Sequence, residues 1–335
     1  MLRPMASALR KAENQVELFH GANVDWLGKK WYFLGFSLIF SIAGVVSMGW
    51  HWAHIGSPVP LGVDFKGGTQ VQVQFTQSPD INKIRSAMDA AGIRDARIQA
   101  FGQATNNEVL LSLPEQTNET TLDTGRERIV NALHAQYDNP FTVRNVQVVG
   151  PTVGQQLERQ AGLATLYSLL GMLVYLWFRF QLIYGVAAVV AVFHDTLITI
   201  GAFALTNQEI SLTVIAAILT LVGYSMNDTI VVFDRIRENL RLTRREPLPD
   251  LVNRSINQTL SRTVLTSGLT FLTVLSLYIF GGQVLRGFSF ALVIGILIGT
   301  YSSIAVAAPM LVAWQEWRAK GGKVTALPAA KRARV

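Results

Sequence analysis

The chain has 335 residues, of which 50% are hydrophobic and 15% are charged, against about 25% charged in an ordinary soluble domain. This deficit of charge, with a mean hydropathy of +0.31, excludes a disordered or coiled-coil protein. The apolar residues form runs long enough to cross a bilayer, so a polytopic membrane protein explains the formal charge of +7 better than nucleic-acid binding does. Without cysteine, the chain can form neither a disulfide nor a thiolate metal site.

Six apolar runs have the roughly 17 to 25 residues that a spanning helix requires. They are 31–50, 161–178, 182–205, 210–233, 264–280 and 288–314. Acidic residues interrupt only two of them, at Asp195 and at Asp228. The sequence therefore predicts six transmembrane helices, of which the first is an uncleaved signal anchor, and both termini on the same side of the membrane.

Lysine and arginine mark the two sides of the membrane. Of the 29 basic residues, 19 lie in segments that a six-span chain places on one side, including seven between Arg235 and Arg262. The positive-inside rule assigns that side to the cytoplasm, and it also allows contact with anionic lipid head groups. The expected division is a cytoplasmic segment 1–30, the span 31–50, an exported domain 51–160, a five-helix remainder 161–314 containing the cytoplasmic loop 234–263, and a basic cytoplasmic tail 315–335.

The exported segment carries the patterns of a small α+β domain. Strict alternation at 69–76 and 141–149 predicts half-buried strands, and 96–101 and 108–113 read as two shorter strands. Helical spacing follows Asp80 and recurs over about 120–137. The resulting order βαββαβ predicts a ferredoxin-like fold. No catalytic constellation is present, so an enzyme is not expected.

An ionised carboxylate inside an apolar helix costs at least ~2.5 to 3.5 kcal/mol. Counting ~1.5 Å per residue from the inner ends of their runs puts Asp195 ~21 Å deep and Asp228 ~10 Å deep. This staggering favours a proton path over a single metal cage. The open alternative is that each aspartate only bonds a neighbouring helix.

Arg262 is the expected partner of Asp228, because the fourth run ends and the fifth begins on the same side. Making and breaking that ion pair would switch the protonation of the carboxylate. The alternative is an interfacial arginine that only reaches toward water. His194 either relays protons or is a buried, hydrogen-bonded histidine; it should point about 100° away from Asp195 around the helix.

Three further patterns have structural explanations. Gly295 and Gly299 form a GxxxG spacing that indicates close helix packing. His51 and His54, beside two tryptophans, indicate an interfacial belt more simply than a zinc site. The stretch 235–262 indicates a helix lying in the membrane interface. No phosphate-binding loop, nucleophile triad or metal-ligand spacing occurs, so no cofactor is expected.

Six segments are similar to motifs of the SecF side of the SecD/SecF family of protein-export membrane proteins, which belongs to the RND superfamily. They are GVDFKGGT at 62–69, VGPTVG at 149–154, FHDTLITIG at 193–201, GYSMNDTIVVFDRIREN at 223–239, SRTVLTSG at 261–268 and GFSFALVIGILIGTYSSI at 287–304. The resemblance covers about residues 25–318, in family order.

The resemblance implies half of an RND-type helix bundle in the bacterial cytoplasmic membrane, paired with SecD. Further implied partners are the SecYEG channel, YajC and YidC, with exported unfolded polypeptides as cargo and the proton-motive force as the energy source. It assigns proton passage to Asp228, in the pair Asn227–Asp228, and to Arg262. The remaining motif positions are structural; they are Gly62, Asp64, Gly67 and Gly68.

Two other functions remain open at this stage. Half of an RND-type small-molecule exporter would also carry intramembrane acids, although such pumps have larger external domains. A structural subunit of a translocase or insertase would conduct no protons, and replacing Asp228 would then have little effect.

Overall fold

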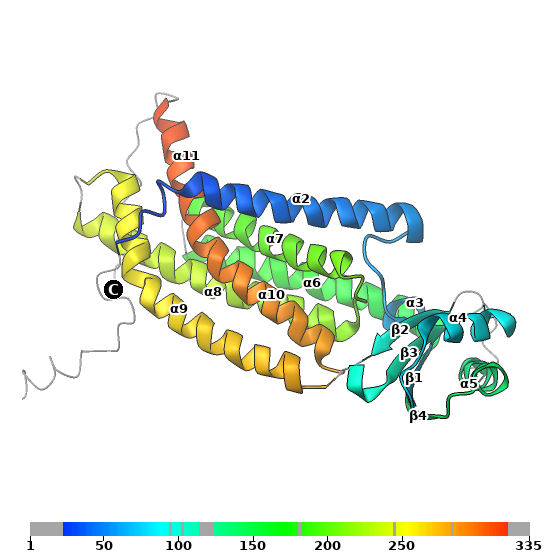
Figure 1. Cartoon of the computed structure of the whole chain (residues 1–335). Helices are drawn as coiled ribbons and strands as arrows, with labels where there is room; N and C mark the ends of the chain where they lie inside the picture. Colours follow the sequence, from blue (N-terminus) through cyan, green and yellow to red (C-terminus); the bar gives the residue numbers. More distant parts are fainter. Residues whose placement is uncertain are drawn as a thin grey trace, which may run out of the picture.

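The computed structural model describes residues 23–93, 96–101, 104–113, 124–179, 182–243, 246–282 and 284–320. Long helices lie side by side in a bundle, and a small α+β domain projects from one end of it (Figure 1). The other end of the bundle carries the starts of α2 (Lys30–Ile55) and α9 (Leu248–Phe280) and the end of α8 (Leu212–Leu242) (Figure 1). Segments distant in sequence therefore meet along the length of the bundle, where the two intramembrane aspartates lie.

Five helical stretches in the described part of the chain are long and apolar enough to cross a membrane. They are α2 (Lys30–Ile55), α7 (Leu182–Leu205), α8 (Leu212–Leu242), α9 (Leu248–Phe280) and the joined stretch that begins with α10 (Arg286–Ser302). That stretch continues through the π-helical turn η2 (Ser303–Ala307) into α11 (Ala308–Lys320). The chain is therefore a multi-pass membrane protein.

Two helices differ from the runs predicted for them. The second run lies inside α6 (Pro151–Arg179), a 29-residue helix whose first turns are polar and which is not among the five apolar stretches found in the described residues. The expected interfacial helix over 235–262 is divided between two elements, because 235–242 end α8. From Leu248 onward it is continuous with the fifth run in α9, whose 33 residues extend about 50 Å. Pro247 and Pro249 flank its first residue, where a helix needs no backbone donor, so they do not break it.

The α+β domain contains all four predicted strands. They are β1 (Gly68–Phe75), β2 (Arg97–Phe101), β3 (Glu108–Leu113) and β4 (Phe141–Val149). They form one antiparallel sheet in the order β2-β3-β1-β4. Its helices are α4 (Ile81–Ala90) and α5 (Thr124–Gln136), with the short α3 (Val63–Lys66) before β1 and a 3-10 turn, Ala104–Asn106, before β3.

Alternation and capping explain these elements. Val71 and Val73 on β1 point into a core shared with both helices, where Ile84 and Leu133 are fully buried. The Asp80 carboxylate accepts hydrogen bonds from the backbone N–H groups of the first turn of α4. The four strands and the helix that follows Asp80 therefore agree with the sequence pattern.

Glycines bring the bundle helices close together. A Cβ atom on Gly44 of α2 would lie 3.0 Å from the Cα of Gly201 on α7. Likewise, a Cβ on Gly295 would collide with the side chain of Leu221, and one on Gly299 would lie 3.0 Å from the Cβ of Ser225. The close packing indicated by the GxxxG spacing is therefore present between α10 and α8.

Candidate functional site

Asp228 lies near the middle of α8, with 2% of its surface exposed. Its Oδ2 accepts a hydrogen bond of 2.6 Å from the hydroxyl of Ser267 on α9, which is also buried. A carboxylate that is withdrawn from water in this way can change its charge only if a proton reaches it along the packed helices.

Arg262 does not form the expected ion pair with Asp228. No contact between them within 4.0 Å occurs in the described chain, and Arg262 is exposed, so its charge acts on Asp228 only over a longer distance. The physical reason is helical phase, since Ser267 follows Arg262 by five residues and lies about 140° away around α9. With Ser267 facing Asp228, Arg262 is turned away. Asn227 is exposed on α8 and also points away from this buried face.

Asp195 on α7 is 1% exposed and is held by two partners. Its Oδ2 accepts a hydrogen bond of 2.5 Å from the hydroxyl of Ser225 on α8, one turn from Asp228. Its Oδ1 lies 2.9 Å from Nδ1 of His194. The sequence predicts that His194 and Asp195 point about 100° apart. This prediction is wrong, because the imidazole turns back along the helix and contacts the carboxylate.

His194 extends this network to the first apolar helix. Its Nε2 lies 3.0 Å from the hydroxyl oxygen of Ser37 on α2. Ser37 in turn contacts the phenolic oxygen of Tyr301 on α10 at 3.4 Å, and the Tyr301 hydroxyl donates to the carbonyl of Phe33. Neither Ser37 nor Tyr301 was predicted, because a serine and a tyrosine in apolar runs give no sequence signal.

The GVDFKGGT motif joins the α+β domain to the bundle. The carboxylate of Asp64 accepts hydrogen bonds from the backbone N–H of Leu212, the first residue of α8, at 2.9 Å and from Nε2 of Gln147 at 2.7 Å. Asp64 thus pairs with a backbone N–H in the first turn of α8 that has no partner within the helix. The N-terminus of a helix also favours a negative charge. Gly62 donates its N–H to the carbonyl of Ile210 at 3.0 Å.

Two glycines of this motif have backbones that suit glycine. Gly67 has φ 73° and Gly68 has φ 128°, in the region that side chains strain. A Cβ on Gly67 would also lie 2.9 Å from the Cα of Pro151, at the start of α6. These glycines therefore allow the backbone before β1 to approach the start of α6 closely, which is a structural role.

An ion pair outside the spanning helices also joins the α+β domain to the bundle. Nε of Arg97 on β2 lies 3.2 Å from Oε1 of Glu209, in the connection between α7 and α8. Burial raises the pKa of Glu209; the charges of Arg97 and Lys66 oppose this rise, and that of Asp64 adds to it. Burial likewise lowers the pKa of Arg97, against the attraction of Glu209. Both directions mean that desolvation outweighs the attraction within the pair.

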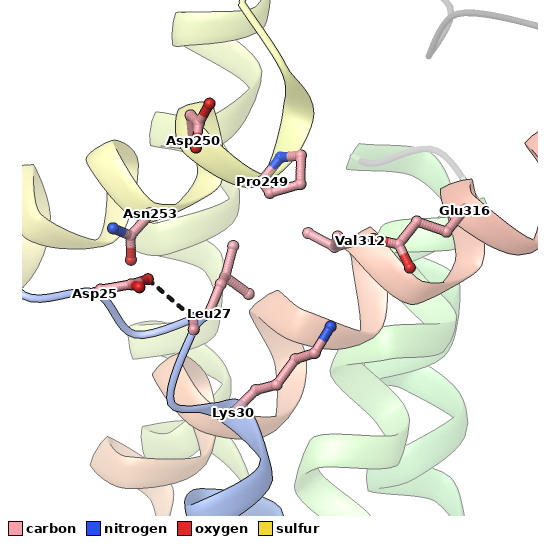
Figure 2. Close-up of a pocket in the computed structure, with 9 residues that line it drawn as sticks. Asp25, Leu27, Lys30, Pro249, Asp250, Asn253, Val312 and Glu316 are labelled. Atoms are coloured by element: carbon pink, nitrogen blue, oxygen red, sulfur yellow. Dashed lines mark hydrogen bonds between the residues drawn. The ribbon is translucent and has the colours of Figure 1, made fainter.

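A polar cavity of about 270 Å³ lies at the opposite end of the bundle (Figure 2). Asp25, Lys30, Asp250 and Glu316 contribute charged groups to its wall, and Asn253 accepts a hydrogen bond of 2.8 Å from the N–H of Trp26. Within the described ranges, no group of three acidic or histidine side chains could hold a metal ion.

Comparisons with known proteins place these features in a family. The family described as "Protein export membrane protein SecD/SecF, C-terminal" matches residues 129–317, and the "SecD/SecF GG Motif" matches residues 55–79. The protein translocase subunit SecF of Koribacter versatilis is 54% identical, over 93% of this chain and 96% of the relative. That of Desulfurispirillum indicum is 43% identical, over 87% of this chain and 92% of the relative.

Solved structures agree with these relatives. A crystal structure of SecDF from Thermus thermophilus, a translocon-associated membrane protein, is 38% identical with a TM-score of 0.77, and the match covers 88% of this chain. SecDF in a super-membrane-facing form matches with a TM-score of 0.64. This chain spans only 39% and 40% of those two longer chains. The matched ranges contain both intramembrane aspartates and the Asp64 motif, and the chain belongs to the SecD/SecF family of protein-export membrane proteins.

Proposed function

We propose that this chain is the SecF subunit of a SecD–SecF complex that uses the proton-motive force to promote protein translocation through SecYEG. The observation that carries this proposal is Asp228, a titratable carboxylate in the middle of an apolar helix, buried against the neutral hydroxyl groups of Ser267 and Thr300. Holding such a group costs free energy, so a functional reason for keeping it is expected.

Proton use follows from the neutral character of the partners of Asp228. Neutral hydroxyls stabilise a carboxylate less than a paired cation does, so the protonated and ionised forms are close enough in free energy to interchange. Arg262 supplies a charge that acts on Asp228 over a longer distance. Asp195 and His194 form a second titratable pair on α7, joined to α8 at Ser225, and we include both, with Asn227, among the candidate proton-pathway residues.

The partners follow from the relatives. Because the matched SecDF chains are more than twice as long, we infer that SecD supplies the remaining part of the complex. SecYEG, YajC, YidC, exported polypeptides and anionic lipids are proposed partners on the same basis. The role is transport, with no enzymatic activity and no cofactor.

The topology belongs to the same proposal. Adding α6 to the five apolar helices gives six spans, and the sheet order β2-β3-β1-β4 with two helices supports a ferredoxin-like periplasmic domain. Both termini lie in the cytoplasm, beside the bacterial inner membrane, with the domain division given above. A phosphatase that works only outside the cytoplasm should be active when fused at Asn118 and silent at Ala329, two positions outside the described residues; the reverse result would overturn this orientation.

Export driven by Asp228 is tested with an isosteric variant. Asp228→Asn keeps shape and hydrogen bonding but removes the titratable proton, so it should assemble with SecD and lose proton-driven stimulation of export. Asp234→Asn is the matched control, because Asp234 lies on the same helix but is exposed. The measurement is export of a secreted protein in cells that contain only the variant, with its membrane level checked by immunoblot.

One observation favours a second function. Both intramembrane carboxylates have hydrogen-bond donors in place, as expected of residues that only join helices. A structural subunit would export normally with a well-assembled Asp228→Asn variant, and the proton proposal would then be abandoned.

A further inference from the structure

The strongest unassigned feature is the hydrogen-bond chain from Asp195 to α2. It links His194 on α7, Ser37 on α2 and Tyr301 on α10. The directions of its hydrogen bonds can be worked out from one end, because each hydroxyl has a single proton to donate.

The Phe33 carbonyl fixes the first direction, since a carbonyl can only accept. The one proton of the Tyr301 hydroxyl is used in that bond. In the contact between Ser37 and Tyr301, Ser37 must therefore be the donor, which uses its one proton. The contact between Ser37 and Nε2 of His194 then requires that Nε2 carries a proton.

The contact between His194 and Asp195 consequently holds one more proton. A neutral imidazole protonated at Nε2 would bring the bare Nδ1 within 2.9 Å of a carboxylate oxygen, where two lone pairs would face each other. A proton shared between Nδ1 and Oδ1 removes that repulsion, whichever atom carries it. Ser225 donates to the other carboxylate oxygen of Asp195, so it does not change the number of protons between His194 and Asp195.

We propose that Ser37 senses the proton held between His194 and Asp195 and thereby couples α2, the helix that leads into the α+β domain, to proton occupancy. With the proton present, Nε2 donates to Ser37 and Ser37 donates to Tyr301. When the proton leaves, His194 keeps its single proton at Nδ1, facing the carboxylate. The Ser37 hydroxyl must then turn to donate to Nε2 and gives up its bond to Tyr301. Of the two hydrogen bonds between Tyr301 and α2, only the one to the Phe33 carbonyl then remains, so α2 is held to α10 less firmly.

The surroundings make α2 responsive to one bond. Most of α2 is exposed, and between residues 31 and 50 it has no acidic, basic or histidine side chain. Other titratable groups on the helices packed against α7 include Tyr32 on α2, Tyr224 and Asp228 on α8 and Tyr301 on α10, and η2 has none. Asp228 lies one turn from Ser225, the residue that donates to Asp195.

The proton count is tested by ¹⁵N solid-state NMR on the histidine-labelled, full-length chain in lipid vesicles. The chain has five histidines, and a His194→Gln variant identifies the signals of His194. At neutral pH, Nε2 of His194 should be protonated. An unprotonated Nε2 would overturn the proposal.

Three variants separate sensing from simple structure. Tyr301→Phe keeps the ring but frees the Ser37 proton, so Nε2 should lose its own proton. Asp195→Asn offers an amide N–H to Nδ1 and should hold Nε2 protonated at every pH. Ser41→Ala, one turn farther along α2, is the control and should leave the signals unchanged. Unaltered Nε2 protonation in Tyr301→Phe would show that Tyr301 does not set the direction in which these hydrogen bonds are donated.

The coupling to α2 is tested by spin labels, which the cysteine-free chain accepts at chosen sites. Labels at the exposed positions Ile39 and Leu297 report the separation of α2 from α10. The distance should increase when the pH is raised and the shared proton is lost, and this change should vanish with Ser37→Ala or Asp195→Asn. A distance that is independent of pH in the otherwise unaltered chain would refute the coupling.

This inference rests on the proposed use of protons but can fail separately. Both measurements are made without export and without Asp228→Asn. Normal export by Asp228→Asn would end the proposed function while leaving the protonation of Nε2 in place.

Discussion

The α+β domain and the helix bundle bury different kinds of side chain. The domain core is almost entirely aliphatic, and Val71, Leu111 and Ile129 are completely enclosed. Of the 17 buried polar or charged residues in the described chain, only Thr69 and Ser112 lie in the sheet. Most of the others line the contacts between bundle helices, as Ser225 and Ser267 do.

This difference reflects the two solvents. In water, removing apolar surface drives folding, so the domain needs only a closed apolar core. Lipid tails are as apolar as leucine, so helices in a membrane associate through close packing and hydrogen bonds. Small residues and hydroxyl groups therefore hold the bundle together, and the hydroxyl groups can also carry or sense protons.

The largest effect is expected in the aliphatic core. Leu111→Ala should lower the free energy of unfolding of the α+β domain by about 2 to 5 kcal/mol, because it leaves a cavity in a closed core. Leu110→Ala, on the opposite face of β3, should cost less. Hydrogen exchange of the sheet amides in the full chain measures both, and equal costs would contradict the assignment of the core face.

Ser267→Ala should destabilise the bundle by about 1.5 to 3 kcal/mol, because Asp228 would lose the hydroxyl that donates to it. Thr266→Ala, one residue away and exposed, is the control. Thermal unfolding in detergent compares the two variants. A loss no larger than that of the control would mean that the hydroxyl contributes little to the bundle.

Gly44→Leu should cost about 1 to 3 kcal/mol, because a side chain there would separate α2 from α7. Gly49→Leu lies on the same helix with open space around it, so it should be tolerated. The same thermal assay applies. If both variants were equally stable, close packing of α2 would not contribute to the bundle.

The smallest effect concerns the junction and its pH dependence. The folded state raises the pKa of Glu209 and so binds that proton more tightly than the unfolded chain does. This stabilisation is complete below the ordinary pKa of 4.5 and is lost as pH rises through the higher folded-state value. The difference in unfolding free energy between the natural chain and Glu209→Gln should therefore shrink with rising pH in that window. A difference that grows with pH would mean that Arg97 outweighs burial.

Local patterns allowed most of the fold to be predicted. Strand alternation predicts the bounds of β4, and the short run 108–113 predicts those of β3. Asp80 marks the start of a helix because capping is a local interaction. The apolar runs gave the spanning helices but not their ends. α8 continues to Leu242 through charged turns that remain helical outside the apolar region.

The partners within the site were beyond local patterns. The two aspartates were found because charge in an apolar run is rare, yet their partners Ser267 and Ser225 are ordinary residues in apolar helices. Arg262 was expected beside Asp228 because both lie near one membrane face, but the turn of α9 directs it elsewhere. The bond between Asp64 and Leu212 joins residues 148 positions apart, a distance over which a single sequence carries no pattern.

The π-helical turn Ser303–Ala307 sets the phase of everything that follows it. One wide turn holds an extra residue, so the buried stripe that runs through Gly295 and Gly299 resumes at Ala307 and Leu311. Removing one residue from this turn would restore ordinary winding and rotate α11 by about 100°. Leu311 would then leave the core, so the length of the chain at this point is itself part of the information that folds the bundle.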